Sequence, residues 1–145
     1  MQGLEWGGVL HYGTQNASRL GMFAAAANLR ELNKAGAAAF THLWDIAETL
    51  CSGLRELFAT EGIPALVQNV GPMLQIMFTE QERINDFRGF CAHVDRVAYQ
   101  HFAWKLFDHG VYMSPSSALH SVACVAHTNN DVSSTLAAVA EVISG

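Results

Sequence analysis

Apolar residues recur at helical spacing in two neighbouring segments near the start of the chain. The first runs from Asn16 to Leu32, and its apolar residues share one face: Leu20, Phe23, Ala24 and Ala27. Asn16 or Ser18 can accept hydrogen bonds from its first free amides, and Gly36 marks its end. A second helix is expected from Ala37 to Ala59, where Gly62 and Pro64 would stop it.

The period then changes to that of extended chain. Residues 65–70 and 73–78 are short apolar segments joined at Gly71-Pro72, which predicts two strands around a turn. The segment 73–78 shows no clean alternation between apolar and polar residues, so we expect this strand to be covered on both faces.

Helical spacing returns between Phe87 and Asp108, with a break expected near Gly89 or His93. Residues 111–113 and 122–126 are predicted strands, and a last helix is expected to begin at 128–130. The order predicts an α+β fold: a small three- to four-stranded, mostly antiparallel sheet with helices packed on one face, preceded by a further helix.

Composition narrows the classes of protein to which the chain can belong. The 145 residues suffice for one domain. A net charge of −5 leaves no basic surface to bind nucleic acid, and no apolar run is long enough for a membrane helix. Only 14% of the residues are charged and 50% are hydrophobic. We therefore expect part of the apolar surface to face a partner.

Cysteines and histidines give no strong motif. Cys51, Cys91 and Cys124 are widely spaced, which argues against a disulfide framework and for a cytoplasmic protein. We expect all three to be small buried hydrophobic residues. The seven histidines match no metal-binding spacing, so no metal site is predicted. His127 is expected to be a hydrogen-bonding group at a strand end.

Four motifs in order resemble a known family. The segments are 13–20, with Gly13-Thr14; 62–73, with Gly62-Ile63-Pro64-Ala65; 110–116, with Gly110-Val111-Tyr112; and 126–132, with Ala126-His127-Thr128. They are similar to the "GT…GNPL", "GIPA…G.GSM", "GVYLPPS" and "AHT.EDI" segments of class III aminotransferases, which are fold type I, pyridoxal-phosphate-dependent enzymes. The glutamate-1-semialdehyde 2,1-aminomutase group is the nearest that we recognise.

The resemblance implies a C-terminal part of a longer enzyme. Residues 1–35 would be a remnant of the large cofactor domain, and residues 36–145 the small C-terminal domain. The Schiff-base lysine of the family lies upstream of the Gly-Thr segment, and neither Lys34 nor Lys105 stands where the family has it. Without that lysine the pyridoxal phosphate cannot be used as an electron sink. We therefore expect no catalytic residue here, no cofactor bound to this chain alone and no catalysis by it alone.

The resemblance also implies one cofactor contact. The threonine of the Gly-Thr pair reaches the cofactor phosphate of a neighbouring subunit in the family, which makes Thr14 the candidate, with Gly13 allowing close approach. By the residues alone, Gly13-Thr14 is a weak anion-binding pattern, because Gly-Thr before a helix is usually just a cap. In the "PSQFE" segment of the aminomutases the glutamate aligns with Leu119, which puts semialdehyde specificity in doubt.

Two functions stay open at this point. The chain is a truncated homologue of a pyridoxal-phosphate-dependent aminotransferase or aminomutase, or it is a stand-alone, non-enzymatic oligomerising or protein-binding module. In either case we expect a homo-oligomer or a missing large domain to cover an apolar patch that includes Leu20, Phe23 and Ala27. The gene upstream of Met1 would distinguish the two.

Overall fold

The computed structural model describes residue 13 and residues 18–145, which divide into two compact units at Ala38–Ala39. Helix α1 (Arg19–Thr60) supplies the helical part of the first unit and the first helix of the second. Within α1, Gly36 has φ 61° and ψ −155°, a conformation that side chains disfavour. The two predicted helices therefore meet at Gly36 in one kinked helix. Whether residues 1–35 derive from a cofactor domain stays a prediction.

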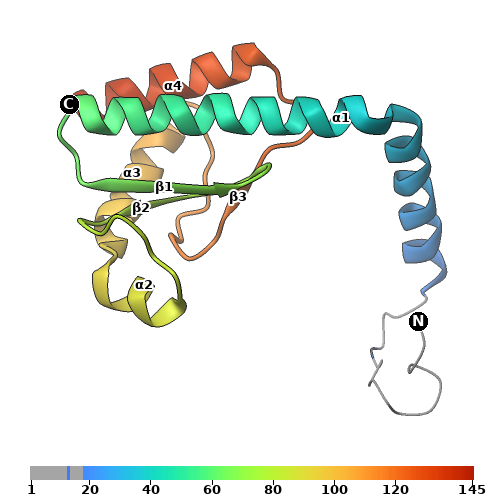
Figure 1. The fold of residues 1–145 in the computed structure, drawn as a ribbon, viewed down its shortest axis with the longest axis horizontal. Helices are drawn as coiled ribbons and strands as arrows, with labels where there is room; N and C mark the ends of the chain where they lie inside the picture. Colours follow the sequence, from blue (N-terminus) through green and yellow to red (C-terminus); the bar gives the residue numbers. More distant parts are fainter. Residues whose placement is uncertain (1–12, 14–17) are drawn as a thin grey trace. The chain divides into compact units, whose positions relative to one another are not determined.

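The second unit is built on a three-stranded antiparallel sheet in the order β1-β2-β3 (Figure 1). Strands β1 (Ala65–Val70) and β2 (Met73–Phe78) form the predicted hairpin, with Ala65 opposite Phe78 and Val70 opposite Met73. Strand β3 (Ser121–Val122) pairs with the start of β2. The predicted α+β class with a small antiparallel sheet is confirmed.

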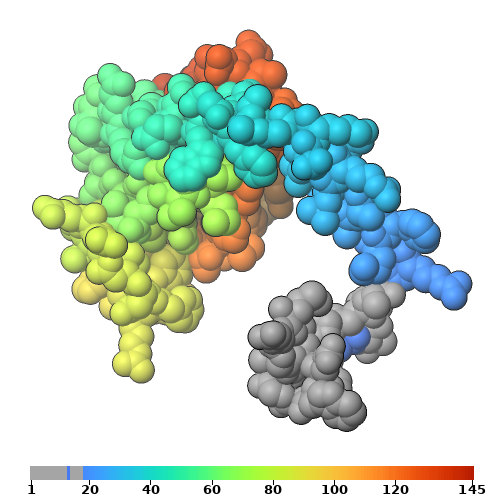
Figure 2. All heavy atoms as spheres, turned by 45° about the vertical axis from the view of Figure 1, so that its right-hand side comes forward, coloured from blue at the N-terminus to red at the C-terminus, as the bar shows by residue number. Residues whose placement is uncertain are grey.

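Helices α1, α3 (Arg96–Asp108) and α4 (Asn129–Ser144) share the main core with one face of this sheet. In Figures 1 and 2, α1 and α4 lie side by side over it. A side chain at Gly53 would come within 2.5 Å of Leu136 of α4, so glycine permits this close packing. The largest fully buried side chains are Phe58, Leu54, Met77, Leu106, Val139 and Cys51.

Helix α2 (Phe87–His93) covers one end of the opposite face, where Phe90 and Val94 pack with Met77. Leu74 and Ile76 of the same strand face the main core. Strand β2 is therefore covered on both faces at its Met77 end, as predicted, whereas Met73 at the other end is 45% exposed. The predicted break near His93 falls at Val94–Asp95, and Asp95 caps α3 by accepting hydrogen bonds from the amides of Val97 and Ala98.

One strand prediction was wrong, and a second was wrong in part. Residues 111–113 form no strand, because the Val111 amide donates to the Leu106 carbonyl at 2.9 Å and closes the end of α3. Strand β3 ends at Val122 rather than at 126. The Cys124 amide donates to His127 Nδ1 at 2.8 Å, and the His127 amide donates to the Cys124 carbonyl at 3.0 Å. These groups bond to each other in a turn and therefore make no hydrogen bonds within the sheet.

Candidate functional site

The structure tests little of the predicted phosphate contact. Gly13 is exposed. Thr14 lies outside the described residues. The sequence left open that this region caps the first helix. Among the described residues Ser18 is the cap, because its Oγ accepts a hydrogen bond from the Gly21 amide at 3.2 Å.

The loop 114–120 is held from two sides. The Tyr99 hydroxyl of α3 donates to the Ser114 carbonyl at 3.1 Å, and the Gln75 amide nitrogen of β2 donates to the Ser117 carbonyl at 2.5 Å. Burial raises the pKa of Tyr99, which keeps its hydroxyl protonated as a donor. Ser117 itself is buried. The sheet and α3 therefore fix the base of this loop.

The tip of the same loop faces solvent. Leu119 is 57% exposed, and His120 beside it is exposed as well. Leu119 is the residue that the resemblance places at the aminomutase glutamate, and its apolar side chain is accessible. A hydrocarbon side chain can exclude water or pack on a ligand, but it can neither accept a proton nor pair with an amine.

A groove of about 360 Å³ opens between α4, β3 and the segment after α3. Its floor is apolar, with Ile46, Leu74 and Val132, and its polar lining includes His127 and Asp131. Thr128 hydrogen-bonds to Asp131 through its hydroxyl and its amide, both at 2.7 Å. These bonds lower the pKa of Asp131. The carboxylate therefore serves the helix cap.

Neither lysine is placed for Schiff-base chemistry. Lys34 is an exposed residue of α1 whose Nζ lies 2.6 Å from Glu31 Oε1. Lys105 is exposed on α3. Neither lines the groove beside α4 or three further grooves of the described residues. Whether this chain alone holds pyridoxal phosphate stays a prediction.

The cysteine prediction was right for one residue and wrong for two. Cys51 is fully buried in the core, whereas Cys91 and Cys124 are exposed, and all three are free thiols. His127 is a hydrogen-bonding group as expected, because its ring accepts from the Cys124 amide, but it lies in the turn after β3 and not at the strand end. In residues 18–145 no three side chains of His, Cys, Asp or Glu converge on a point where a metal could bind. Over the same residues, no helix has the length and apolarity to cross a bilayer.

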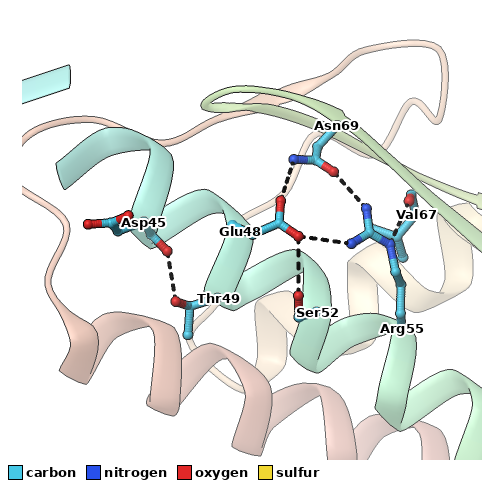
Figure 3. A network of polar contacts seen from close by, with 7 residues as sticks. All are labelled: Asp45, Glu48, Thr49, Ser52, Arg55, Val67 and Asn69. Carbon is cyan, nitrogen blue, oxygen red and sulfur yellow. Dashed lines mark hydrogen bonds and ion pairs between the residues drawn. The ribbon is translucent and has the colours of Figure 1, made fainter. Parts of the chain in front are cut away.

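No role for Arg55 was predicted from the sequence. In the structure Arg55 crosses from α1 to β1 and joins Glu48 and Asn69 in a polar network (Figure 3). Part of this network could have been predicted from the sequence. Glu48 and Arg55 are seven residues apart, two helical turns, and so lie on one face of α1. Their strand partners could not be deduced from spacing.

Solved structures define the class of fold. An omega-transaminase from Sphaerobacter thermophilus matches with a TM-score of 0.71 and 20% identity over 94% of this chain and 30% of its own. A transaminase with bound pyridoxal phosphate matches with a TM-score of 0.73 and 17% identity over 94% of this chain and 29% of its own. The fold is thus one that forms part of transaminases.

Sequence comparison narrows the group of proteins to which the chain is similar. Glutamate-1-semialdehyde 2,1-aminomutase from Thermus thermophilus is 34% identical over 94% of this chain and 31% of its own length. The enzyme of that name from Chloroflexus aggregans is 33% identical over 89% of this chain and 30% of its own. No protein-family model matches the chain. The chain is similar to these pyridoxal-phosphate-dependent enzymes and spans about 30% of their length, which fits the expected C-terminal part.

Proposed function

We propose that the chain is the small C-terminal part of an aminotransferase- or aminomutase-type enzyme and that it completes a cofactor-bearing part instead of catalysing by itself. The observation that carries this proposal is the match of 94% of the chain to 31% of an aminomutase. The positions of Lys34 and Lys105 support it, because both side chains are exposed to solvent. Pyridoxal phosphate would be held by the other part.

The loop 114–120 would be the contribution of this chain to substrate selection. Its base is fixed by Tyr99 and Gln75, and Leu119 would present hydrocarbon where the aminomutases carry a glutamate. The substrate of the assembled enzyme would be an amino-group donor or acceptor with an apolar portion beside Leu119. A carboxylate at that position would favour a substrate amine instead.

Gly13 and Thr14 would bind the cofactor phosphate of a neighbouring subunit. One hydroxyl donor to a phosphate contributes about 1.5–3 kcal/mol. In the assembled enzyme, Thr14→Val should therefore weaken cofactor retention by about ten- to a hundredfold. Unchanged cofactor dissociation together with a lower melting temperature of this chain would show that Thr14 is a helix cap and not a phosphate ligand.

Incubation of this chain with pyridoxal phosphate tests its expected lack of independent catalysis. Borohydride reduction followed by peptide mapping should show no stoichiometric adduct on Lys34 or Lys105, because neither lysine lies in an enclosed pocket of the described residues. Lys34→Arg and Lys105→Arg provide matched controls for non-specific labelling. One full equivalent on a single lysine, lost in the corresponding variant, would overturn the proposal.

A stand-alone oligomerising module is the second candidate, and the exposed face of the first half of α1 favours it. Leu20 is 82% exposed, Phe23 is 75% exposed, and Ala27 is exposed with them. Sedimentation should show a dimer or larger oligomer at micromolar concentration, which Phe23→Ser would weaken and Glu31→Gln would not. A monomer at that concentration would contradict self-association through this face.

We also propose a cytoplasmic location. Three free thiols, two of them exposed, suit a reducing compartment. Quantifying the free thiols of the protein as isolated from its native cell tests this, since oxidation of Cys91 or Cys124 to a disulfide would contradict it.

A further inference from the structure

Among the described residues, no strand pairs with one edge of strand β1. The sheet order places β1 at the edge. The Thr79 amide donates to the Pro64 carbonyl at 2.9 Å, so Pro64 faces β2. Because backbone groups alternate in direction along a strand, the amides and carbonyls of Ala65, Val67 and Asn69 face outward. Such an edge is a template for pairing with another chain.

The composition of β1 makes this edge prone to pairing. Its sequence is ALVQNV, with no charged residue and no proline. Short uncharged segments rich in apolar and β-branched residues pair readily with copies of themselves. The usual protections, a lysine or a proline within the edge strand itself, are absent from β1.

Side chains from α1 occupy the middle of this edge instead (Figure 3). Arg55 Nε donates to the Val67 carbonyl at 3.1 Å, and Arg55 Nη2 donates to Asn69 Oδ1 at 2.6 Å. Glu48 Oε2 accepts from Asn69 Nδ2 at 3.2 Å. Glu48 Oε1 accepts from Ser52 Oγ at 3.3 Å and from Arg55 Nη1 at 3.5 Å. A charged donor thus fills the position that the amide of an added strand would take.

We infer that the network of Glu48, Ser52, Arg55 and Asn69 guards the edge of β1 against pairing with the β1 strand of a second copy of this chain. A second strand would have to displace Arg55 from the Val67 carbonyl and cover the charges of Arg55 and Glu48. Covering charges that lose their hydrogen-bond partners is unfavourable. This inference does not depend on the proposed enzymatic function.

Arg55→Met tests the guard, because methionine keeps much of the aliphatic stem and removes every donor. Arg88→Met, at an exposed arginine of α2, is the matched control. We expect Arg55→Met to self-associate about tenfold or more tightly than the wild type in sedimentation, and Arg88→Met to be unchanged. In Arg55→Met the amides of Val67 and Asn69 should exchange more slowly as protein concentration rises, whereas in the wild type their exchange should not depend on concentration.

The exchange measurement distinguishes two roles of Arg55: a guard that keeps a second strand from the edge of β1, and a clamp that only links α1 to β1. A clamp predicts that Arg55→Met leaves these two amides unchanged or makes them exchange faster at every concentration, and that result would overturn the inference. Protection of the same amides in the wild type would overturn it too, because the edge would already be paired. If Arg55→Met does not fold, Arg55→Gln, which also removes the charge, takes its place. The Val67 and Asn69 amides of Arg55→Gln should show weaker concentration-dependent protection, and the absence of such protection would count against the guard.

Discussion

The two halves of α1 are both helical but differ in what covers them. Between Arg19 and Ala35 the large apolar side chains Leu20, Met22, Phe23 and Leu29 are all exposed. Between Ala37 and Thr60, Ile46, Ala47, Cys51, Leu54 and Phe58 are buried. The same helical spacing therefore produced a core in one half and a bare surface in the other. Periodicity identifies a helix face, and only the rest of the assembly decides whether that face is buried.

A pair of identical substitutions gives the most direct test of this contrast. Leu54, which has no exposed surface, and Leu20, which is 82% exposed, lie in the same helix. Leu54→Ala should lower the free energy of unfolding by about 2–5 kcal/mol through lost burial and a cavity. Leu20→Ala should change it by no more than about 0.5 kcal/mol. Urea unfolding followed by circular dichroism measures both, and equal losses would show that the first half is covered in solution.

Alkylation of the cysteine thiols measures how well the second half of α1 is protected from solvent. Burial first, and Glu48 secondarily, raises the pKa of Cys51 to about 11 from an ordinary 9.0, against an opposing effect of Arg55. Below the ordinary value its thiolate is therefore roughly a hundredfold scarcer than that of an unshifted thiol. Mass spectrometry after iodoacetamide treatment should show Cys91 and Cys124 modified first and Cys51 only on unfolding. Early modification of Cys51 would mean that this half of α1 opens readily.

Removal of two helix caps gives a further test of the difference between the second unit and the exposed first half of α1. Thr128 caps α4 in the covered unit through a reciprocal pair of bonds with Asp131, while Ser18 caps the bare half of α1. Thr128→Ala should cost about 1 kcal/mol of unfolding free energy. Ser18→Ala should reduce helix content while leaving the main unfolding midpoint in place, because the segment it caps contributes little to the core. A shift of that midpoint with Ser18→Ala would show that the two halves unfold together.

The smallest expected effect is a pH dependence from Asp131. Hydrogen bonds from Thr128 lower the pKa of Asp131 in the folded chain. The stabilisation is therefore present above the unfolded value, about 3.9, and is lost as pH falls through the lower folded value. The difference in unfolding midpoint between the wild type and Asp131→Asn should stay constant near neutral pH and shrink in acid. A difference that grew in acid would contradict the assigned direction.

Local patterns predicted most elements because their signals are short in range. The hairpin strands 65–70 and 73–78 match the structure. The start of α4 at Asn129 also matches, since Thr128 and Asp131 lie within one turn and bond to each other. The predicted strand at 111–113 failed because its Val111 amide bonds to the Leu106 carbonyl, and apolar composition alone does not reveal that use of the amide.

The sequence by itself determined the helices, the hairpin and the likeness to aminotransferases, because each depends on residues close together or on motifs in order. Only the tertiary structure decided which faces are covered. It buried Cys51 and left Cys91 and Cys124 exposed, and it brought Arg55 to the edge of β1, next to Val67 and Asn69. These outcomes depend on the register of strands and the packing of helices far apart in the chain, where burial and hydrogen bonding are set by neighbours that spacing does not specify.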